Sequence, residues 1–299
     1  MTAMQAMRYG RENAATLGVL VMLFGIFVFV VNDTLGKWLV QSFAIGQVLF
    51  MRSAVALLVL VLIMRGEGVR QALRAEKPVM QALRAILATV EVIAFYGAVM
   101  YLPLADTMAF WLAAPLYVAA LSPLLLREQV GWRRWTAIIV GFIGVLIVLQ
   151  PSRESFTAPA FIAIGGSLAF ALMMLTARSL RGTPDKTLSF WQTAAALIGG
   201  AVLAPFGWAT PSLADFFLLG ILGLLAMLAH ICVTRAFKLA DAATVAPLQY
   251  TMLIWAALFG YLVFGDVPRP AMILGSLIIV VSGLFLFFRE RKRAQEVVS

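Results

Sequence analysis

Charged residues are scarce in this chain: only 12% of its 299 residues are Asp, Glu, Lys or Arg, whereas 63% are hydrophobic. A soluble domain has about 25% charged and about 45–50% apolar residues, because polar side chains must cover its surface. A water-soluble fold of this length would have too few charged side chains to cover its surface. Lipid must therefore form part of the solvent around the folded protein.

Cysteine and histidine are almost absent, since Cys232 and His230 are the single members of their types. One thiol excludes an internal disulfide and a zinc cluster. One Cys and one His also leave few residues that could serve as an enzymatic nucleophile and its base. A membrane-embedded enzyme is therefore the less favoured class. The sequence has no phosphate-cradling Gly-Lys motif of an ATP-driven pump and no charged ring or carbonyl filter of a channel. We expect no cofactor and no metal.

Basic residues give a net charge of +9, but they form short clusters between apolar runs rather than a stripe interleaved with aromatics. Nucleic acid is therefore not an expected partner. If the N-terminus is inside, the inner segments hold most of the 23 Lys and Arg residues and the outer loops hold only Arg153 and Arg269. This bias predicts a multi-pass protein of a bacterial inner (plasma) membrane with both termini in the cytoplasm.

Apolar segments near the length needed to span a bilayer core of about 30 Å recur along the whole chain. The expected spans are 15–39, 46–64, 83–101, 104–126, 132–149, 159–179, 187–206, 213–237, 240–264 and 269–288. The first is too long for a signal peptide and is interpreted as an uncleaved helix. The predicted fold class is an all-α polytopic membrane protein with ten transmembrane helices.

The two halves of the chain resemble each other. Leu-Ala-Asp-Thr at 104–107 recurs as Leu-Ala-Asp-Ala at 239–242, each before a long helix that closes near an acidic residue, Glu128 or Asp266. Gly25, Phe29 and Lys37 match Gly166, Phe170 and Arg178 at one constant spacing. Five helices per repeat is an odd number, so the second copy enters the membrane from the opposite side. We predict two inverted five-helix repeats, 1–150 and 151–299.

These residues resemble the drug/metabolite transporter superfamily, specifically its ten-helix EamA-type members. The resemblance rests on Leu23-Phe24-Gly25 through Lys37, on Phe50-Met51-Arg52, on the two Leu-Ala-Asp segments and on the acidic residues after helices four and nine. The Val90-Glu91 region is most similar to the YddG-type bacterial amino-acid exporters. Val90 departs from an aromatic-rich substrate site, which argues against a preference for aromatic substrates. The resemblance implies an exporter that works by alternating access.

Charged groups within the spans are informative, because each costs about 2.5–3.5 kcal/mol in hydrocarbon and therefore tends to face a cavity or a partner. Asp33 and Lys37 are four residues apart on the first helix, so they can pair with each other. Arg52, near the outer end of helix two, is expected either to anchor on backbone carbonyls or Asp33, or to act as a gate. These three residues are predicted to have a gating or structural role.

Glu91 lies near the centre of helix three with no basic neighbour one turn away. Such a carboxylate is either protonated or bound to a cation, and a substrate ammonium or a proton would supply one. The alternative is a protonated acid hydrogen-bonded to a neighbouring helix. His230 follows a face with small residues and is either a packed interior residue or a contact for substrate or proton. Asn32 shares a face with Gly18 and Gly25, and is expected to point inward.

Pro115 and Pro247 interrupt helices four and nine, the corresponding helices of the two halves. Interrupted helices at matching positions are a strong sequence indication of a transporter's binding site. Trp111, Gln249 and Tyr250 lie nearby and would offer a zwitterion an aromatic face with amide and hydroxyl groups. Ordinary helix packing would explain Trp111 and Tyr250 equally well. Together with Asn32, Glu91 and His230, these residues are the predicted transport pathway.

Two transport hypotheses remain open on these residues. The first is export of small polar metabolites, amino acids foremost, and the second is efflux of cationic drugs or uptake of a metabolite. The membrane-embedded enzyme is the alternative from a different class. The expected partners are a small-molecule substrate and membrane lipid, and a monomer is the default expectation.

Overall fold

The computed structural model describes residues 3–64, 77–126, 131–149, 157–180, 182–240 and 242–298, and these residues form helices without strands. The helices are α1 (Ala3–Val40), α2 (Ile45–Met64), α4 (Pro78–Val99), α5 (Leu104–Leu112), α6 (Ala114–Leu126), α7 (Trp132–Leu149), α8 (Ala158–Ser179), α9 (Asp185–Leu203), α10 (Leu213–Leu239), α11 (Ala242–Val245), the 3-10 helix η1 (Ala246–Thr251), α12 (Met252–Phe264) and α13 (Pro270–Val298).

Eight of the ten expected spans each correspond to one of these helices, the span 104–126 corresponds to α5 and α6, and the span 240–264 corresponds to α11, η1 and α12. Eight spans in the described residues are long and apolar enough to cross a membrane, α7 has a shorter apolar stretch at Trp135–Val148, and α9 completes the set. The helical ends of α1 and α13 extend past the predicted spans at 15 and 288. Both extensions are polar, so the helices continue beyond the segment that lipid surrounds.

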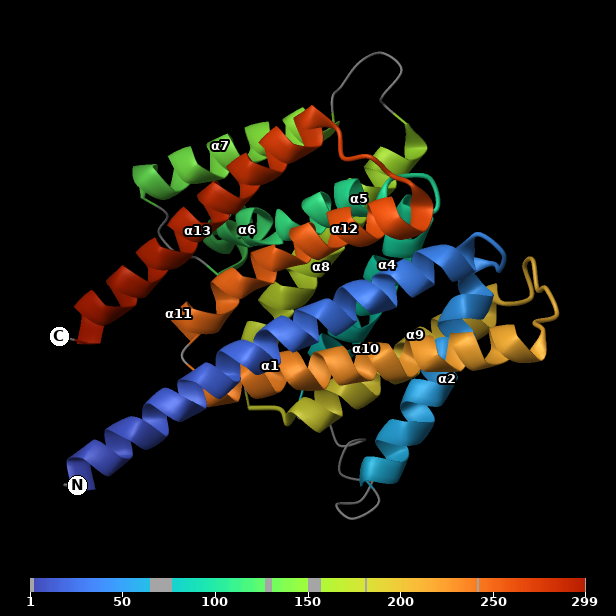
Figure 1. Cartoon of the computed structure of the whole chain (residues 1–299), viewed down its shortest axis with the longest axis horizontal. Coiled ribbons are helices and arrows are strands. Elements are labelled where there is room, and N and C mark those ends of the chain that lie inside the picture. Colours follow the sequence, from blue (N-terminus) through green and yellow to red (C-terminus); the bar gives the residue numbers. More distant parts are fainter. Residues whose placement is uncertain are drawn as a thin grey trace.

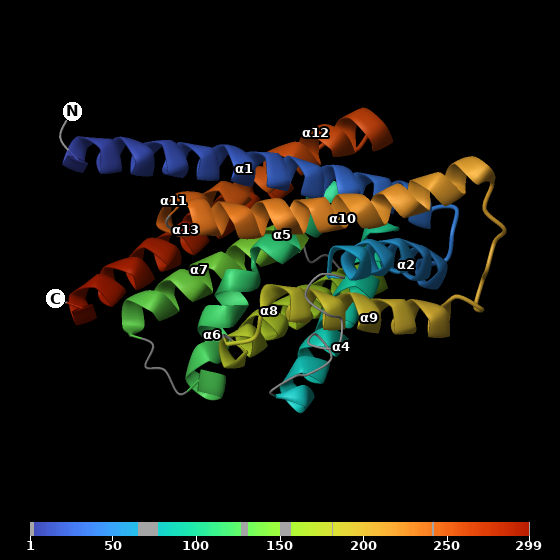
Figure 2. The same cartoon turned by 90° about the horizontal axis from the view of Figure 1, so that it is seen from below.

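The packing of the helices follows the inverted repeat. α1 runs along α10, and the equivalent helices of the other half, α8 and α4, run along each other. α2 packs on its own counterpart α9, and α7 on its counterpart α13 (Figure 1). The first turns of α1 and the last turns of α13 lie at the same end of the molecule in both views (Figures 1 and 2). The protein is therefore an all-α membrane protein of ten helices in two inverted repeats.

Glycine allows the counterpart helices to touch backbone to backbone. A Cβ added at Gly144 of α7 would lie 2.8 Å from the carbonyl oxygen of Gly275 of α13. A Cβ added at Gly200 of α9 would lie 2.7 Å from the Cα of Phe50 in α2. Small residues at helix contacts are the usual means of close packing in membranes, where burial of apolar surface gives no preference for protein over lipid.

The outer surface of the bundle is apolar. On α1 the exposed residues Leu17, Leu20 and Phe24 recur at three- and four-residue spacing, and on α9 Ile198 and Val202 are exposed in the same way. The buried set, in contrast, includes Asn32, Asp33, Lys37 and Asp106. Apolar side chains outside and polar ones inside suit a helical bundle whose surroundings are hydrocarbon.

Two spans are broken, as the prolines predict. α5 ends at Leu112 and α6 begins at Ala114, with Pro115 in the first turn of α6. Pro115 has no N–H to donate to the carbonyl one turn earlier. In the second half the span begins as α11, tightens into η1 at Pro247 and continues as α12. Of the two acidic residues predicted to close these spans, Asp266 is described, whereas Glu128 lies outside the described residues. Asp241, in the Leu-Ala-Asp segment before the second span, also lies outside them.

Candidate functional site

Seven polar or aromatic side chains from five helices form what we call the central polar cluster. They are Asn32 and Asp33 of α1, Arg52 of α2, Glu91 and Tyr96 of α4, Trp111 of α5 and His230 of α10. The Arg52 guanidinium interacts electrostatically with Asp33, Glu91 and His230. Asp33 and Glu91 also interact with each other, so both carboxylates belong to one site.

On α1 the cluster begins with an amide and a carboxylate. Asn32 and Asp33 are 2% and 8% exposed, and the Asn32 Nδ2 donates to the Asp33 Oδ1 at 2.9 Å. The Asn32 Oδ1 is buried and has no hydrogen-bond partner within the described structure. A buried acceptor without a partner is costly, which makes this oxygen a ready partner for a donor such as an ammonium group.

Arg52 is held by Tyr96 rather than by backbone carbonyls or by Asp33. The Arg52 Nη1 donates to the Tyr96 hydroxyl, and the guanidinium carbon lies 5.6 Å from the centre of the ring. Tyr96 is fully buried, and its ring lies against Gly36 of α1, where an added Cβ would meet the ring at 2.7 Å. The expected anchor for Arg52 exists, but its partner is a side chain that sequence reasoning missed.

Glu91 forms a hydrogen bond to a neighbouring helix. The Trp111 Nε1 donates to the Glu91 Oε1 at 2.5 Å, and the Trp111 ring also meets Phe95 edge-on with ring centres 5.2 Å apart. The two residues were predicted separately, from a lone carboxylate and from an aromatic near a helix break. The structure brings them together across α4 and α5.

His230 of α10 faces α1, where its ring packs edge-on against Phe29 with centres 5.1 Å apart. Its surface is largely accessible, in contrast to Asn32 and Asp33. Phe29 precedes Asn32 by three residues and Asp33 by four, so the three lie on one face of α1. His230 is thus an exposed member of the cluster, at its α10 edge, rather than part of a sealed helix contact.

The predicted residues of the second broken span lie elsewhere. The Tyr250 hydroxyl points at α13, where a Cβ added at Gly283 would overlap it. Gln249 and Pro247 are half-buried in η1, which packs on α1. The aromatic contact that does join this span to α1 is Trp255 with Phe27, whose ring centres are 5.2 Å apart.

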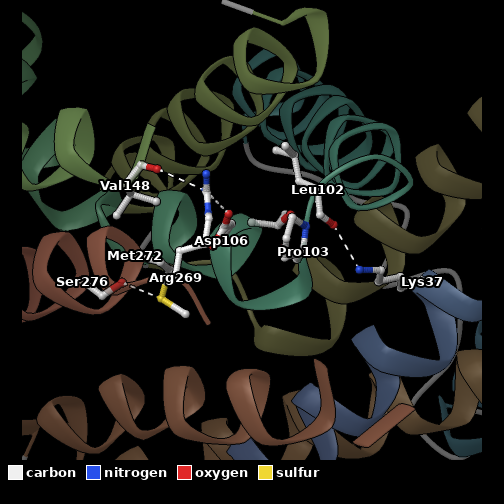
Figure 3. Close-up of polar contacts among 9 residues, drawn as sticks. Lys37, Leu102, Pro103, Asp106, Val148, Arg269, Met272 and Ser276 are labelled. Carbon is white, nitrogen blue, oxygen red and sulfur yellow. Dashed lines mark hydrogen bonds and ion pairs between the residues drawn. The ribbon is translucent and has the colours of Figure 1, made fainter. Parts of the chain in front are cut away.

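Two ion pairs join the halves of the chain at what we call the Lys37 end of the bundle, the end with Lys37, Leu102, Asp106, Asp266 and Arg269. The Lys37 Nζ donates to the Asp266 Oδ2 at 2.8 Å and to the Leu102 carbonyl at 3.1 Å. Arg269 donates to Asp106, and also to the carbonyl of Val148 at 3.5 Å (Figure 3).

The expected pairing of Asp33 with Lys37 is wrong. Lys37 lies in the last turn of α1, from which its long side chain reaches past the helix end to the loop before α13. Its nitrogen also lies 4.5 Å from the centre of the Phe264 ring. Asp33, one turn earlier, is bonded by Asn32 and belongs to the central polar cluster.

A shallow apolar hollow of about 320 Å³ lies between α2 and α9 and does not include the cluster. Its lining is Phe50, Ala201, Ala204, Pro205 and Trp208. It offers no charged group, and we do not assign the transport site to it. Within the described residues, no group of three or more His, Cys, Asp or Glu could hold a metal ion.

The chain belongs to the EamA-like transporter family, whose model matches residues 16–150 and again 157–288. The protein is thus a membrane transporter, and its family and named relatives are transporters rather than enzymes. One solved crystal structure superposes on this chain with a TM-score of 0.62 at 13% identity. The superposition includes 94% of this chain and 98% of the other. That likeness concerns the fold.

Three relatives are similar along almost the whole chain. The S-adenosylmethionine uptake transporter of Rickettsia prowazekii is 25% identical over 92% of this chain and 94% of its own length. The riboflavin transporter of Vibrio cholerae is 29% identical, over 93% and 95%. The pseudopaline exporter CntI of Pseudomonas aeruginosa is 26% identical, over 90% and 95%. These names include both uptake and export, and they do not single out the YddG-type amino-acid exporters.

Proposed function

We propose that this protein is a secondary transporter that moves a small metabolite with a cationic group, amino acids foremost, through the central polar cluster by alternating access. The observation that carries the proposal is the pair of carboxylates, Asp33 and Glu91, beside one guanidinium, Arg52. If all three are charged, the cluster has one negative charge in excess. A substrate cation would neutralise it, which matters because unpaired charge is costly within a membrane.

An amino acid fits this arrangement with both of its charged groups. Its ammonium group would bind between Asp33 and Glu91 and reach the unpartnered Asn32 oxygen, while its carboxylate would face Arg52. The rings of Phe95 and Trp111 would pack on an apolar side chain. Charge-assisted hydrogen bonds of this kind are stronger than neutral ones and fix the orientation of a zwitterion.

A flat heterocyclic cation is the second candidate. Trp111, Phe95, Tyr96 and Phe29 place aromatic rings around the carboxylates, and such rings bind cations over their faces. The relatives named for S-adenosylmethionine and riboflavin support a substrate with a fused ring system. Cationic drugs share the same chemistry and would use Glu91 in the same way.

The position of the Lys37 end relates the structure to the two sides of the membrane. The basic-residue bias places this end outside the cell, with both termini in the cytoplasm of a bacterial inner membrane. Two ion pairs close that end here, so the cluster would be loaded from the cytoplasm. Both export and uptake cycles pass through such a state, so the direction rests on the resemblance to exporters: we propose export, with uptake as the alternative. The matching repeats are proposed to divide the chain at 1–150 and 151–299.

A transport assay in proteoliposomes tests the proposal. Radiolabelled amino acids and S-adenosylmethionine are offered with and without a pH gradient, to wild-type protein and to Glu91→Gln. Glu91→Gln keeps an oxygen for Trp111 but loses the charge, so we expect transport to fall by about tenfold or more, the factor that corresponds to about 1.4 kcal/mol. Asp215→Asn, in the exposed cap of α10, is the matched acid-to-amide control and should transport normally. Equal transport by wild type and Glu91→Gln would contradict the role of the cluster.

A further inference from the structure

α5 links the central polar cluster to the Lys37 end. It is a nine-residue helix, Leu104–Leu112, and all nine of its residues are buried. Pro103 precedes it, and the break at Ala113 with Pro115 follows it, so the backbone bends at both of its ends. A short helix between two breaks can move as a unit without unwinding its neighbours.

The two ends of α5 hold different contacts. Trp111, in its last turn, donates to Glu91 of the cluster at 2.5 Å. Asp106, in its first turn, accepts from Arg269, and the Leu102 carbonyl just before the helix accepts from Lys37 (Figure 3). Asp106 and Trp111 are about 7.5 Å apart along the helix axis, at 1.5 Å per residue.

We propose that α5 is a lever that couples the occupancy of Glu91 to the opening of the ion-paired Lys37 end, with Trp111 as the positioning residue. This proposal rests on the proposed function, because it assumes that a substrate cation binds Glu91. The indole N–H can only donate, and it donates to the carboxylate that the cation would take. A cation that binds between Asp33 and Glu91 draws the Glu91 carboxylate toward Asp33, and this weakens the hydrogen bond from Trp111.

The Trp111–Glu91 hydrogen bond holds the last turn of α5 to α4, so weakening this bond frees α5 to shift. That shift displaces Asp106, which is 3% exposed and depends on Arg269 for its charge. The ion pair at the other end of the same helix is weakened, and the Lys37 end opens. By linkage, opening of that end must change the affinity at Glu91 by the same factor.

The test measures how fast a cysteine at the Lys37 end reacts. Ala105 is 5% exposed and adjacent to Asp106, so Ala105→Cys in a Cys232→Ala background reports the opening of that end to a bulky maleimide. The measurement uses purified full-length protein in detergent micelles without substrate. Trp111→Phe is added because it keeps an aromatic ring for Phe95 and removes the N–H together with the second ring of the indole. We expect the reaction to become about tenfold faster, which equals a shift of about 1.4 kcal/mol.

Three controls make the result specific. Trp135→Phe, at an exposed tryptophan of α7, is the matched substitution and should leave the rate unchanged. Asp106→Asn opens the ion pair directly and should accelerate the reaction at least as much as Trp111→Phe. Ala236→Cys, a fully buried site on α10, should stay unreactive in the Trp111→Phe protein.

Each contrary result overturns the proposal. A Trp111→Phe rate equal to that of Trp135→Phe means that α5 transmits nothing. A wild-type rate in Asp106→Asn means that the ion pair does not close this end. Reaction of Ala236→Cys in the Trp111→Phe protein means that the substitution loosens the whole bundle. Since no substrate is present, a failure here leaves the transport assay unaffected, and a failure of transport leaves the measured coupling in place.

Discussion

Removal of Asp266 should destabilise the protein more than removal of its partner Lys37. The Lys37 side chain is 6% exposed, whereas that of Asp266 is 27% exposed. Asp266→Asn therefore leaves a buried ammonium without a carboxylate, with only neutral oxygens such as the Leu102 carbonyl at 3.1 Å. Lys37→Met instead leaves a carboxylate that water can reach, and places an apolar chain against the Phe264 ring.

The magnitude follows from this asymmetry. Breaking a fully buried pair from one side costs about 3–5 kcal/mol, and the remaining bond to Leu102 lowers the expected cost of Asp266→Asn to about 2–3 kcal/mol. Lys37→Met should cost about 1 kcal/mol, as for a partly exposed pair. The double variant should cost about as much as Lys37→Met alone, because no unpaired ammonium remains.

The assay is reversible unfolding in mixed micelles, followed by tryptophan fluorescence, for the wild type, both single variants and the double variant. The four free energies of unfolding give the coupling between the two side chains. We expect a coupling of about 2–3 kcal/mol. Strictly additive costs, or a smaller cost for Asp266→Asn than for Lys37→Met, would refute the reasoning from burial.

Two further predictions concern helix packing, and the same unfolding assay measures both. Gln47 is fully buried, and its amide exchanges two hydrogen bonds with the backbone of Ala209, at 2.6 and 2.9 Å. Gln47→Ala should cost about 1–2 kcal/mol because it leaves the half-buried Ala209 groups without these hydrogen bonds; a cost below about 0.5 kcal/mol would contradict that role. Gly200→Val should cost at least about 3 kcal/mol, because the Cβ would overlap the backbone of Phe50 and force α9 away from α2. Gly165→Val, where an added Cβ meets nothing within 4 Å, is the control and should cost less than about 1 kcal/mol.

The fold could be predicted from the sequence because the bilayer removes most alternatives. A long apolar segment in lipid must satisfy its own backbone, so length and hydropathy alone locate the helices. The prolines at 115 and 247 were enough to predict both broken spans, since each removes a backbone donor. The extension of α13 to Val298 could not be predicted from hydropathy, because a helix does not end where lipid ends.

The site was predicted only in part, and the reason is geometric. Asn32, Glu91, Trp111 and His230 stand out in a sequence because polar or isolated groups are rare within spans, and the structure places them in one cluster. Tyr96 gave a weaker signal, since a tyrosine in an apolar helix is also an ordinary packing residue. Tyr250 was predicted because it lies near Pro247 in a broken span, but its hydroxyl faces α13. Whether a tyrosine faces the cluster or another helix depends on the rotation of its helix about the helix axis, which the sequence does not give.

Partners far apart in the chain are the hardest to predict. Lys37 has an acidic neighbour one turn away in Asp33, and helix periodicity favours that local pair. Its actual partner, Asp266, is 229 residues away and reaches it because the two halves are inverted around one site. Sequence periodicity does not show which loop lies at the end of α1. The packing of the helices places the loop with Asp266 there.

Access to Asn32 from the two sides of the membrane tests the central claim most directly. Asn32→Cys, in the Cys232→Ala background, is reconstituted in proteoliposomes of known orientation and treated with a membrane-impermeant thiol reagent on one side at a time. We expect reaction from the side opposite the Lys37 end, and a switch toward the Lys37 side when Asp106→Asn is added. Equal reaction from both sides, or from neither side in both proteins, would contradict a site that opens alternately.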